Sequence, residues 1–128
     1  MKEILDHLTK HFIFLFEEKN FKIINSEYYS KEAAKVTLTC EYFFIRLYQE
    51  RDHTFMDIGS VFDNEAYADS FWIKKIILQE ANPDDNTVAA LHALFLRTQF
   101  EKIVALFAAE NYKNTIQLTK QLYKERWS

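Results

Sequence analysis

Apolar residues recur at helical spacing in the first segment of the chain. The apolar stripe consists of Leu5, Leu8, Phe12, Leu15 and Phe16, with Ile4 at its edge. The residues on the opposite side are charged, at Lys2, Asp6, Lys10 and Glu17. Because a period of about 3.6 residues places such positions on one face of a helix, the pattern predicts an amphipathic helix from Lys2 to about Lys19.

After this helix the period shortens to two residues, which is typical of β-strands. The segment FKIINSEYY predicts a strand from Phe21 to about Ser26, and NSEYYSKE supplies turn residues after it. In KVTLTC, the inward set Val36, Leu38 and Cys40 alternates with lysine and threonine. The two β-branched threonines favour a strand over a helix.

The segment EYFFIRLYQERDHTFMDIGSV predicts two more strands joined by a tight turn at Arg51 and Asp52. Counting outward from that turn pairs Leu47 with Met56 and Ile45 with Ile58 on one face, and Arg46 with Asp57 and Tyr48 with Phe55 on the other. Both faces of this ribbon therefore carry large side chains. A strand with one face in water alternates apolar and polar residues, so we expect something to cover the second face.

A similar turn at Cys40 and Glu41 extends the same register to the preceding strand. It places Val36 opposite Ile45 and Leu38 opposite Phe43. The three strands then share one apolar face, and the sequence predicts an antiparallel meander of three or four strands.

Helical periodicity returns after Val61. A helix is predicted from about Asp69 to Glu80, with Trp72, Ile73, Ile76 and Ile77 at helical spacing, ending at Asn82-Pro83 in the turn NPDDN. A second helix restarts near Asp85 or Asn86 with Val88, Leu91 and Phe95 inward. Ile103, Val104 and Phe107 continue on the same helix or follow a break near Thr98, so residues 86–109 form one helix or two. A last helix, capped by Asn111 or Asn114, runs to about Arg126 and uses Ile116, Leu122, Tyr123 and Trp127.

This order of elements predicts a single α+β domain over residues 1–128. We expect the N-terminal helix to pack on the face that bears Val36, Ile45 and Ile58. We expect the three or four C-terminal helices to cover the other face, although a partner protein could cover it instead. If that face were left uncovered, a homodimer would be favoured.

Composition narrows the functional classes. The net charge is −3 and the sequence pI is about 5.8, which argues against nucleic-acid partners. Lys113, Lys120, Lys124 and Arg126 could form a local basic patch, but this spacing is typical of the solvated side of a helix. The only glycine, Gly59, argues against a glycine-rich phosphate loop, and no cofactor is expected. The single cysteine, Cys40, forms no internal disulfide or cysteine metal cage. The N-terminus resembles neither a signal peptide nor a membrane span, so we expect a cytoplasmic protein with no membrane partner.

Candidate catalytic and metal-ligating residues each have a simpler structural interpretation. His7 and His11 lie one helical turn apart but lack a third ligand, and we interpret them as boundary residues rather than a metal site. Cys40 with His53 or His92 could form a thiol nucleophile, yet Cys40 continues an inward set and is expected to be buried. His92 lies next to a core stripe and needs no special role. No carboxylate pair has a catalytic spacing that the sequence alone defines, so no catalytic residue is predicted.

Arg46 and Asp57 are the most informative polar pair, because they are expected to face each other among aromatic residues. The surrounding residues are Tyr42, Phe44, Tyr48 and Phe55. A charged spot within an apolar patch is typical of the centre of a protein–protein interface. The competing interpretation, which we favour, is that helices of the same chain cover the pair.

In size, charge and order of elements the chain resembles small bacterial α+β proteins of the toxin-immunity type, in which an acidic surface can neutralise a basic toxin domain. The end of the chain, QFEKIVALFAAENYKNTIQLTKQLYKERW, is similar to the helical tail of small uncharacterised bacterial proteins. The resemblance implies an acidic protein–protein interaction module without enzymatic activity. The alternative is a small-ligand-binding protein or enzyme with a pocket between sheet and helices.

Overall fold

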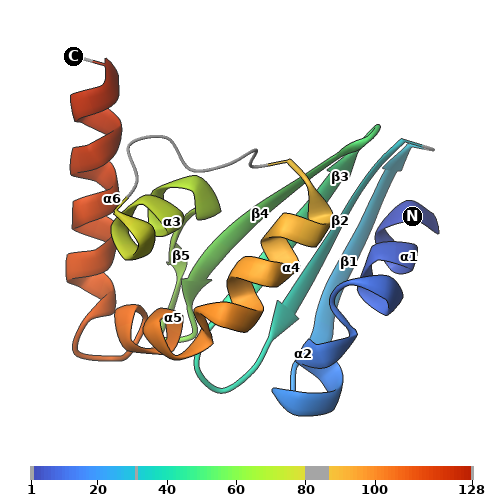
Figure 1. Ribbon diagram of the computed structural model, residues 1–128, viewed down its shortest axis with the longest axis horizontal. Coiled ribbons are helices and arrows are strands. Elements are labelled where there is room, and N and C mark those ends of the chain that lie inside the picture. The colour runs from blue at the N-terminus through green and yellow to red at the C-terminus, as the bar shows by residue number, and fades with distance from the viewer. Residues whose placement is uncertain (1, 31, 80–86, 128) are drawn as a thin grey trace.

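The fold is α+β, as the order of elements predicts. The computed structural model describes residues 2–30, 32–79 and 87–127. Its antiparallel strands lie side by side in the order of the sequence (Figure 1). They are β1 (Lys22–Ser30), β2 (Ala33–Thr39), β3 (Phe44–Glu50), β4 (His53–Ser60) and β5 (Asp63–Asp69). Over the described residues the sheet thus has five strands, where three or four were expected.

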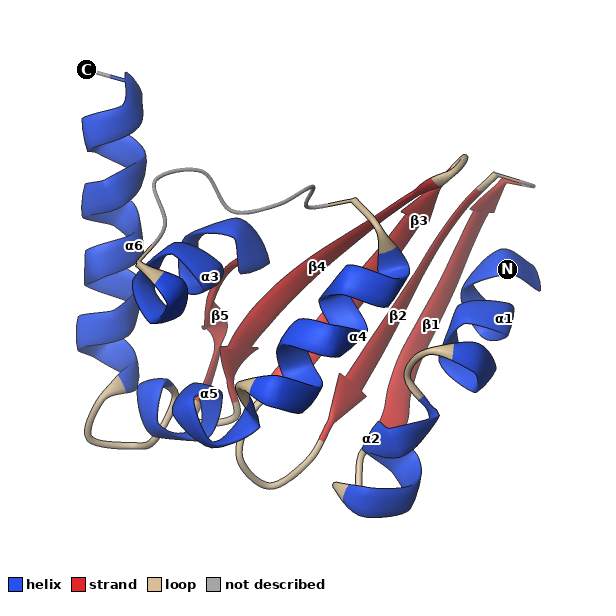
Figure 2. Cartoon of the chain, viewed as in Figure 1, coloured by secondary structure: helices blue, strands red, loops and turns tan. Residues whose placement is uncertain are grey.

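The helices form one layer against this sheet. They are α1 (Lys2–Lys10), α2 (Ile13–Glu18), α3 (Ser70–Leu78), α4 (Ala89–Thr98), α5 (Phe100–Leu106) and α6 (Tyr112–Trp127). Helix α1 packs on β2 and β3, α3 packs on β4 and β5, and α4 packs on β4. Helix α6 lies beside β5 and α3, at one edge of the molecule (Figure 2). No helix in the described ranges is long and apolar enough to cross a membrane.

The register of the β3–β4 hairpin agrees with the prediction at every position. Arg46 lies opposite Asp57, and the inward residues of the two strands are fully buried. The four predicted pairs are Ile45 with Ile58, Arg46 with Asp57, Leu47 with Met56 and Tyr48 with Phe55. Residue Arg51 supplies the positive φ, 55°, that a tight turn without glycine requires.

The predicted turn at Cys40 and Glu41 is wrong. The structure pairs Val36 with Leu47 and Leu38 with Ile45, a shift of two residues from the expected register. The connection is longer because Phe43, which is fully buried, turns into the core with its ring 5.4 Å from that of Phe21. A shift of two residues leaves every side chain on its predicted face, so the composition of the apolar face was predicted correctly.

Strands β1 and β5 also differ from the prediction. Strand β1 continues to Ser30, through the residues expected to form a turn. Strand β5 was not predicted because its inward residues, Ala66 and Ala68, are too small to give a strong alternating pattern. The turn NPDDN at 82–86 lies outside the described residues.

The N-terminal segment forms two helices where one was expected. Helix α1 ends at Lys10, and α2 begins at Ile13. The change of direction between them brings Phe12 into the core, while Leu5, expected on the apolar stripe, is 46% exposed. The C-terminal region likewise breaks between Thr98 and Phe100, which settles that residues 89–106 form two helices.

The expectation that the C-terminal helices cover the second sheet face is not met. Buried residues of α1 to α5 share one core with the inward residues of β2, β3 and β4. Residues Tyr112 and Ile116 of α6 pack against the same core. The described helices therefore lie on the face of Val36, Ile45 and Ile58, and the face that bears Arg46 and Asp57 is left without a helical cover. We call it the open face.

Candidate functional site

The open face is built from alternate residues of four strands. Side chains on this face alternate along each strand with the residues that point into the core. They are Lys35 and Thr37 of β2, Phe44, Arg46 and Tyr48 of β3, Phe55 and Asp57 of β4, and Tyr67 and Asp69 of β5. Neighbouring side chains on this face shield Phe44, which is only 5% exposed although no described helix covers it. Phe55 and Tyr67 are 36% and 44% exposed.

Arg46 occupies the centre of the open face and stacks on aromatic rings. Its guanidinium carbon lies 4.8 Å from the ring centre of Phe44 and 4.5 Å from that of Tyr67. One terminal nitrogen donates a hydrogen bond of 3.3 Å to the backbone carbonyl of Asn64. The register with Asp57 is the predicted one, but the guanidinium is directed to the rings and to this carbonyl. Stacking of this kind suits the planar arginine head group and holds it in one orientation.

Asp57 lies opposite Asp69 in the β4–β5 register, and its pKa is raised to about 6. Burial is the main cause, because it disfavours the charged form, and repulsion by Asp69 is the second. Arg46 and Lys35 act in the opposite direction and lower the pKa. The carboxylate of Asp69 also accepts a hydrogen bond of 2.9 Å from the backbone N–H of Phe71 and so caps α3.

The β2 side of the open face is polar. Lys35 forms an ion pair of 3.0 Å with Glu27 of β1, and its ammonium lies 5.6 Å from the ring centre of Tyr48. The hydroxyl of Tyr29 also donates to Glu27, and this hydrogen bond is the main reason that the pKa of Glu27 is lowered. Burial raises the pKa of Tyr48.

Five of the six predicted binding residues lie together on the open face, and Tyr42 lies apart. The five are Phe44, Arg46, Tyr48, Phe55 and Asp57. Tyr42 belongs to the loop before β3 and lines a pocket of about 690 Å³ at one end of the sheet. Cys40, Lys19 and Phe100 line the same pocket, which lies between the sheet end and the helices α2 and α5.

The other sequence candidates do not assemble into a catalytic or metal site. The rings of His7 and His11 are 5.8 Å apart, and burial is the first cause of the lowered pKa of His11. Within the described residues, no three His, Cys, Asp or Glu side chains are arranged to hold a metal ion. Cys40 was expected to be buried but is only half-buried, with its thiol sulfur 3.4 Å from the backbone nitrogen of Tyr42. His53 begins β4 at the opposite end of the sheet.

His92 has a role that the sequence did not indicate. It is fully buried, and its Nε2 lies 2.7 Å from the backbone carbonyl of Thr54, so Nε2 carries the proton and donates it. Its Nδ1 is then the acceptor for the buried ammonium of Lys74, 3.3 Å away. This contact joins α3, α4 and β4 through one side chain.

Thr54 and Gln49 continue the buried polar network. The Thr54 hydroxyl donates to Gln49 Oε1 at 2.6 Å, and Gln49 Nε2 donates to Glu3 at 3.1 Å. Both residues occupy inward positions in the β3–β4 register, where the sequence places polar residues among apolar ones. That mismatch is the signal that could have predicted the network from the sequence.

Comparison of the chain with protein-family models, with curated proteins and with solved structures gives no match.

Proposed function

We propose that this chain is a protein–protein interaction module that binds its partner through the open face. The observation that carries the proposal is the set of large side chains on a sheet face that no described helix covers. Arg46 is fixed between Phe44 and Tyr67, with Tyr48 and Phe55 beside it. Arginine and tyrosine are enriched among the residues that dominate binding energy at interfaces, and rigid side chains lose little entropy on binding.

The specific form of the proposal is an immunity-type function, in which the chain neutralises a basic toxin domain. The support is the acidic net charge of −3 together with the carboxylates of Asp57 and Asp69 on the open face. A basic partner that placed a cation beside Asp57 would favour its charged form and relieve its repulsion with Asp69. The products of adjacent genes are the first partners to test.

Alanine substitutions on two faces of the molecule test the proposal. The double variant Tyr48→Ala/Phe55→Ala removes two aromatic rings from the open face. The control, Leu94→Ala, removes an exposed apolar side chain from α4 in the helical layer. We expect the double variant to weaken binding to a candidate toxin domain at least about tenfold, and the control to bind as the parent does. Equal binding by all three proteins would show that the open face is not the interface.

Sedimentation of the purified protein tests whether a second copy is the partner. An immunity-type function requires the parent to be monomeric when no other protein is present, whereas the uncovered open face by itself favours a homodimer. A dimer that dissociates in Tyr48→Ala/Phe55→Ala would mean that the open face binds another copy of this chain, and the immunity-type function would then lose its binding surface.

A second candidate function is small-ligand binding, which the pocket of about 690 Å³ between the sheet end and the helices favours. Its wall is chemically mixed, with the Tyr42 hydroxyl, the Cys40 thiol and the ring of Phe100, over which Lys19 Nζ lies at 4.4 Å. Ligands would be found by screening for compounds that raise the melting temperature. A compound whose effect is lost in Tyr42→Ala and retained in Tyr48→Ala would support this function.

A further inference from the structure

A second distinctive surface lies between α3 and the C-terminal half of α6. Four aromatic rings follow one another across the two helices. The ring centres are 4.9 Å apart for Phe71 and Trp72, 5.9 Å for Trp72 and Tyr123, and 6.3 Å for Tyr123 and Trp127. Tyr123 and Trp127 remain 56% and 68% exposed, so their rings are available to a ligand.

The surface around these rings is hollowed. A depression of about 340 Å³ is bounded by Tyr67, Lys120 and Lys124, and a second of about 320 Å³ is bounded by Arg126 and Trp127. Both depressions share the walls formed by Asp69, Trp72 and Tyr123, so they adjoin. We refer to the two together as the aromatic groove.

Positive charge is concentrated on the two helices that form the groove. Helices α3 and α6 carry six basic residues and one acidic residue, a net charge of +5, whereas the whole chain carries −3 and the remaining residues therefore carry −8. The basic residues are Lys74, Lys75, Lys113, Lys120, Lys124 and Arg126, and the acidic residue is Glu125. Lys74 is buried, and of the other five basic residues Lys120, Lys124 and Arg126 line the groove, together with one acidic residue, Asp69.

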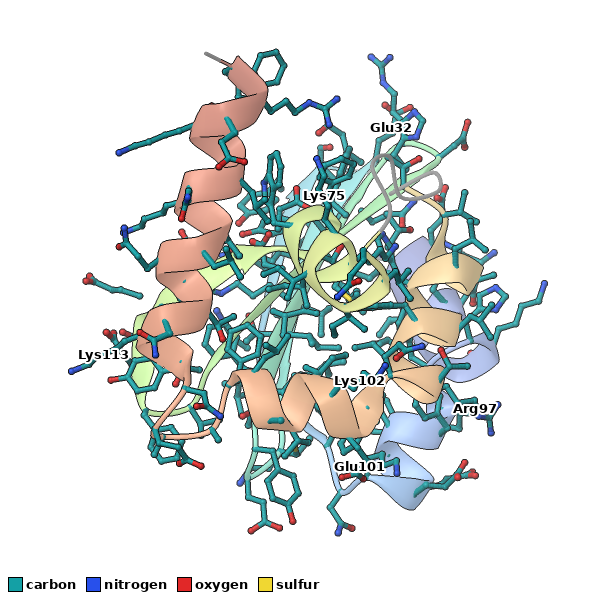
Figure 3. The ribbon with its side chains drawn as sticks, turned by 60° about the vertical axis from the view of Figure 1, so that its left-hand side comes forward. Glu32, Lys75, Arg97, Glu101, Lys102 and Lys113 are labelled. Carbon is teal, nitrogen blue, oxygen red and sulfur yellow. The ribbon has the colours of Figure 1, made fainter. Side chains whose placement is uncertain are left out.

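Two of these cations already lie against the rings. Arg126 lies 5.0 Å from the ring centre of Phe71 and 5.5 Å from that of Trp127, and Lys75 lies 5.8 Å from that of Trp72. Side chains of α3 and α6 meet in the space between the helices, with Lys75 projecting from α3 (Figure 3). Cations thus lie against three of the four rings, and Lys113 lies near the start of α6 (Figure 3).

We propose that the aromatic groove binds single-stranded nucleic acid. Exposed rings bind unpaired bases by stacking, and neighbouring lysine and arginine side chains bind the phosphates between them. A duplex keeps its bases stacked internally and offers nothing to Trp127 and Tyr123. In the sequence, the net charge of the chain argued against nucleic acid, and the basic residues of the last helix were interpreted as its solvated side. The structure adds the aromatic rings that lie beside them.

The chain offers a direct reporter of this site. Its two tryptophans, Trp72 and Trp127, both line the groove, so intrinsic tryptophan fluorescence reports on the groove alone. Titration with a short oligothymidylate at low salt should quench the fluorescence in a saturable manner. The logarithm of the binding constant should fall linearly with the logarithm of the salt concentration, with a slope of about 0.7 for each phosphate neutralised.

Two further probes separate nucleic acid from other anions. An abasic oligonucleotide of the same length keeps the phosphates and lacks the bases, and we expect it to bind at least about tenfold more weakly. Vesicles that contain phosphatidylserine offer anionic charge without bases and should cause no quenching. Quenching by the vesicles and not by the oligonucleotide would replace the proposal with a membrane surface. Equal binding of the two oligonucleotides would show that the groove binds anions in general and that base stacking does not contribute.

Charge reversal locates the site. Lys124→Glu lies in the groove, and Lys102→Glu makes the same charge change on α5, away from the groove (Figure 3). Both lysines are exposed, so both variants should remain folded. We expect Lys124→Glu to weaken oligothymidylate binding about tenfold and Lys102→Glu to leave it unchanged. An equal loss of oligothymidylate affinity in the two variants would mean non-specific electrostatic attraction. No loss of affinity in either variant would mean that the oligonucleotide binds outside the groove.

Discussion

The ring of Phe44 packs directly on the backbone of Gly59, its partner across β3 and β4. A Cβ atom added at Gly59 would overlap the ring. Since the φ angle of Gly59 is not positive, the glycine is required for space rather than for an unusual backbone conformation. The ring in turn supports the guanidinium of Arg46, so the only glycine of the chain lies beneath the centre of the proposed binding face.

Gly59→Ala should therefore lower the free energy of unfolding by about 1–3 kcal/mol, because the added methyl group displaces the ring of Phe44. Urea denaturation measures the loss. In the background of Phe44→Leu, whose side chain is smaller and more adaptable, the same substitution should cost clearly less. An equal cost in both backgrounds would show that Phe44 is not what Gly59 accommodates.

Asp57→Asn should stabilise the protein near neutral pH. The pKa of Asp57 is raised to about 6, so the folded state binds the proton more tightly than the unfolded state does. The free energy of unfolding then falls as the pH rises from about 4 to about 6, and the loss is complete above both pKa values. The amide carries no charge to desolvate, so we expect the variant to exceed the parent by on the order of 1 kcal/mol at about pH 7.5 and by much less at about pH 4.

Urea denaturation at the two pH values tests this difference, and Asp63→Asn, at an exposed carboxylate of β5, is the matched control. Asp69→Asn should lower the pKa of Asp57, because it removes the negative charge that repels the Asp57 carboxylate. The asparagine side chain can still cap α3. A stability difference for Asp57→Asn that stays constant with pH would contradict the raised pKa.

Arg46 and Asp57 should be energetically coupled through charge, although the guanidinium is directed to the rings. Arg46 lowers the pKa of Asp57, and the two residues lie directly opposite each other. A double-mutant cycle of Arg46→Ala and Asp57→Ala should give a favourable coupling of about 0.5 kcal/mol at about pH 7.5. The coupling should disappear at about pH 4, where Asp57 is protonated. Additivity at both pH values would show that the pair does not interact.

Thr54 and Gln49 form a buried hydrogen bond, and removing only one of the two partners should lower the free energy of unfolding because the other partner is left unsatisfied. Thr54→Val removes the donor to Gln49 Oε1 in a site where both residues are buried, so we expect a loss of about 1–3 kcal/mol. Adding Gln49→Leu removes the stranded acceptor, and the double variant should lose less than the sum of the two single variants. Thermal or urea unfolding of the three variants measures this, and a strictly additive result would contradict the network.

Much of the sheet could be predicted because its signals are local. The alternation in β3 and β4 assigns each residue to a face, and the turn at Arg51 sets the register. The same alternation gave the correct faces even where the turn before β3 was misplaced. Five of the six candidate binding residues were identified in this way, since parity alone brings them onto one face.

Other features depended on information that periodicity does not contain. Strand β5 has alanines at its inward positions, and the adjacent β4 edge, not its own pattern, makes it a strand. His92 appeared to be an incidental neighbour of a core stripe until the chain brought Lys74 and Thr54 to its two nitrogens.

By itself, the sequence determined the class of fold, the face of each central strand and the β3–β4 register, because these follow from spacing along a few neighbouring residues. Only the tertiary structure decided that the described helices occupy one side of the sheet, so that none of them covers the face of Arg46 and Asp57. It also decided that the basic residues of α3 and α6 meet beside Trp72 and Trp127. The physical reason is that the choice of layer and the meeting of distant charges depend on how the whole apolar surface is buried, which no single segment specifies.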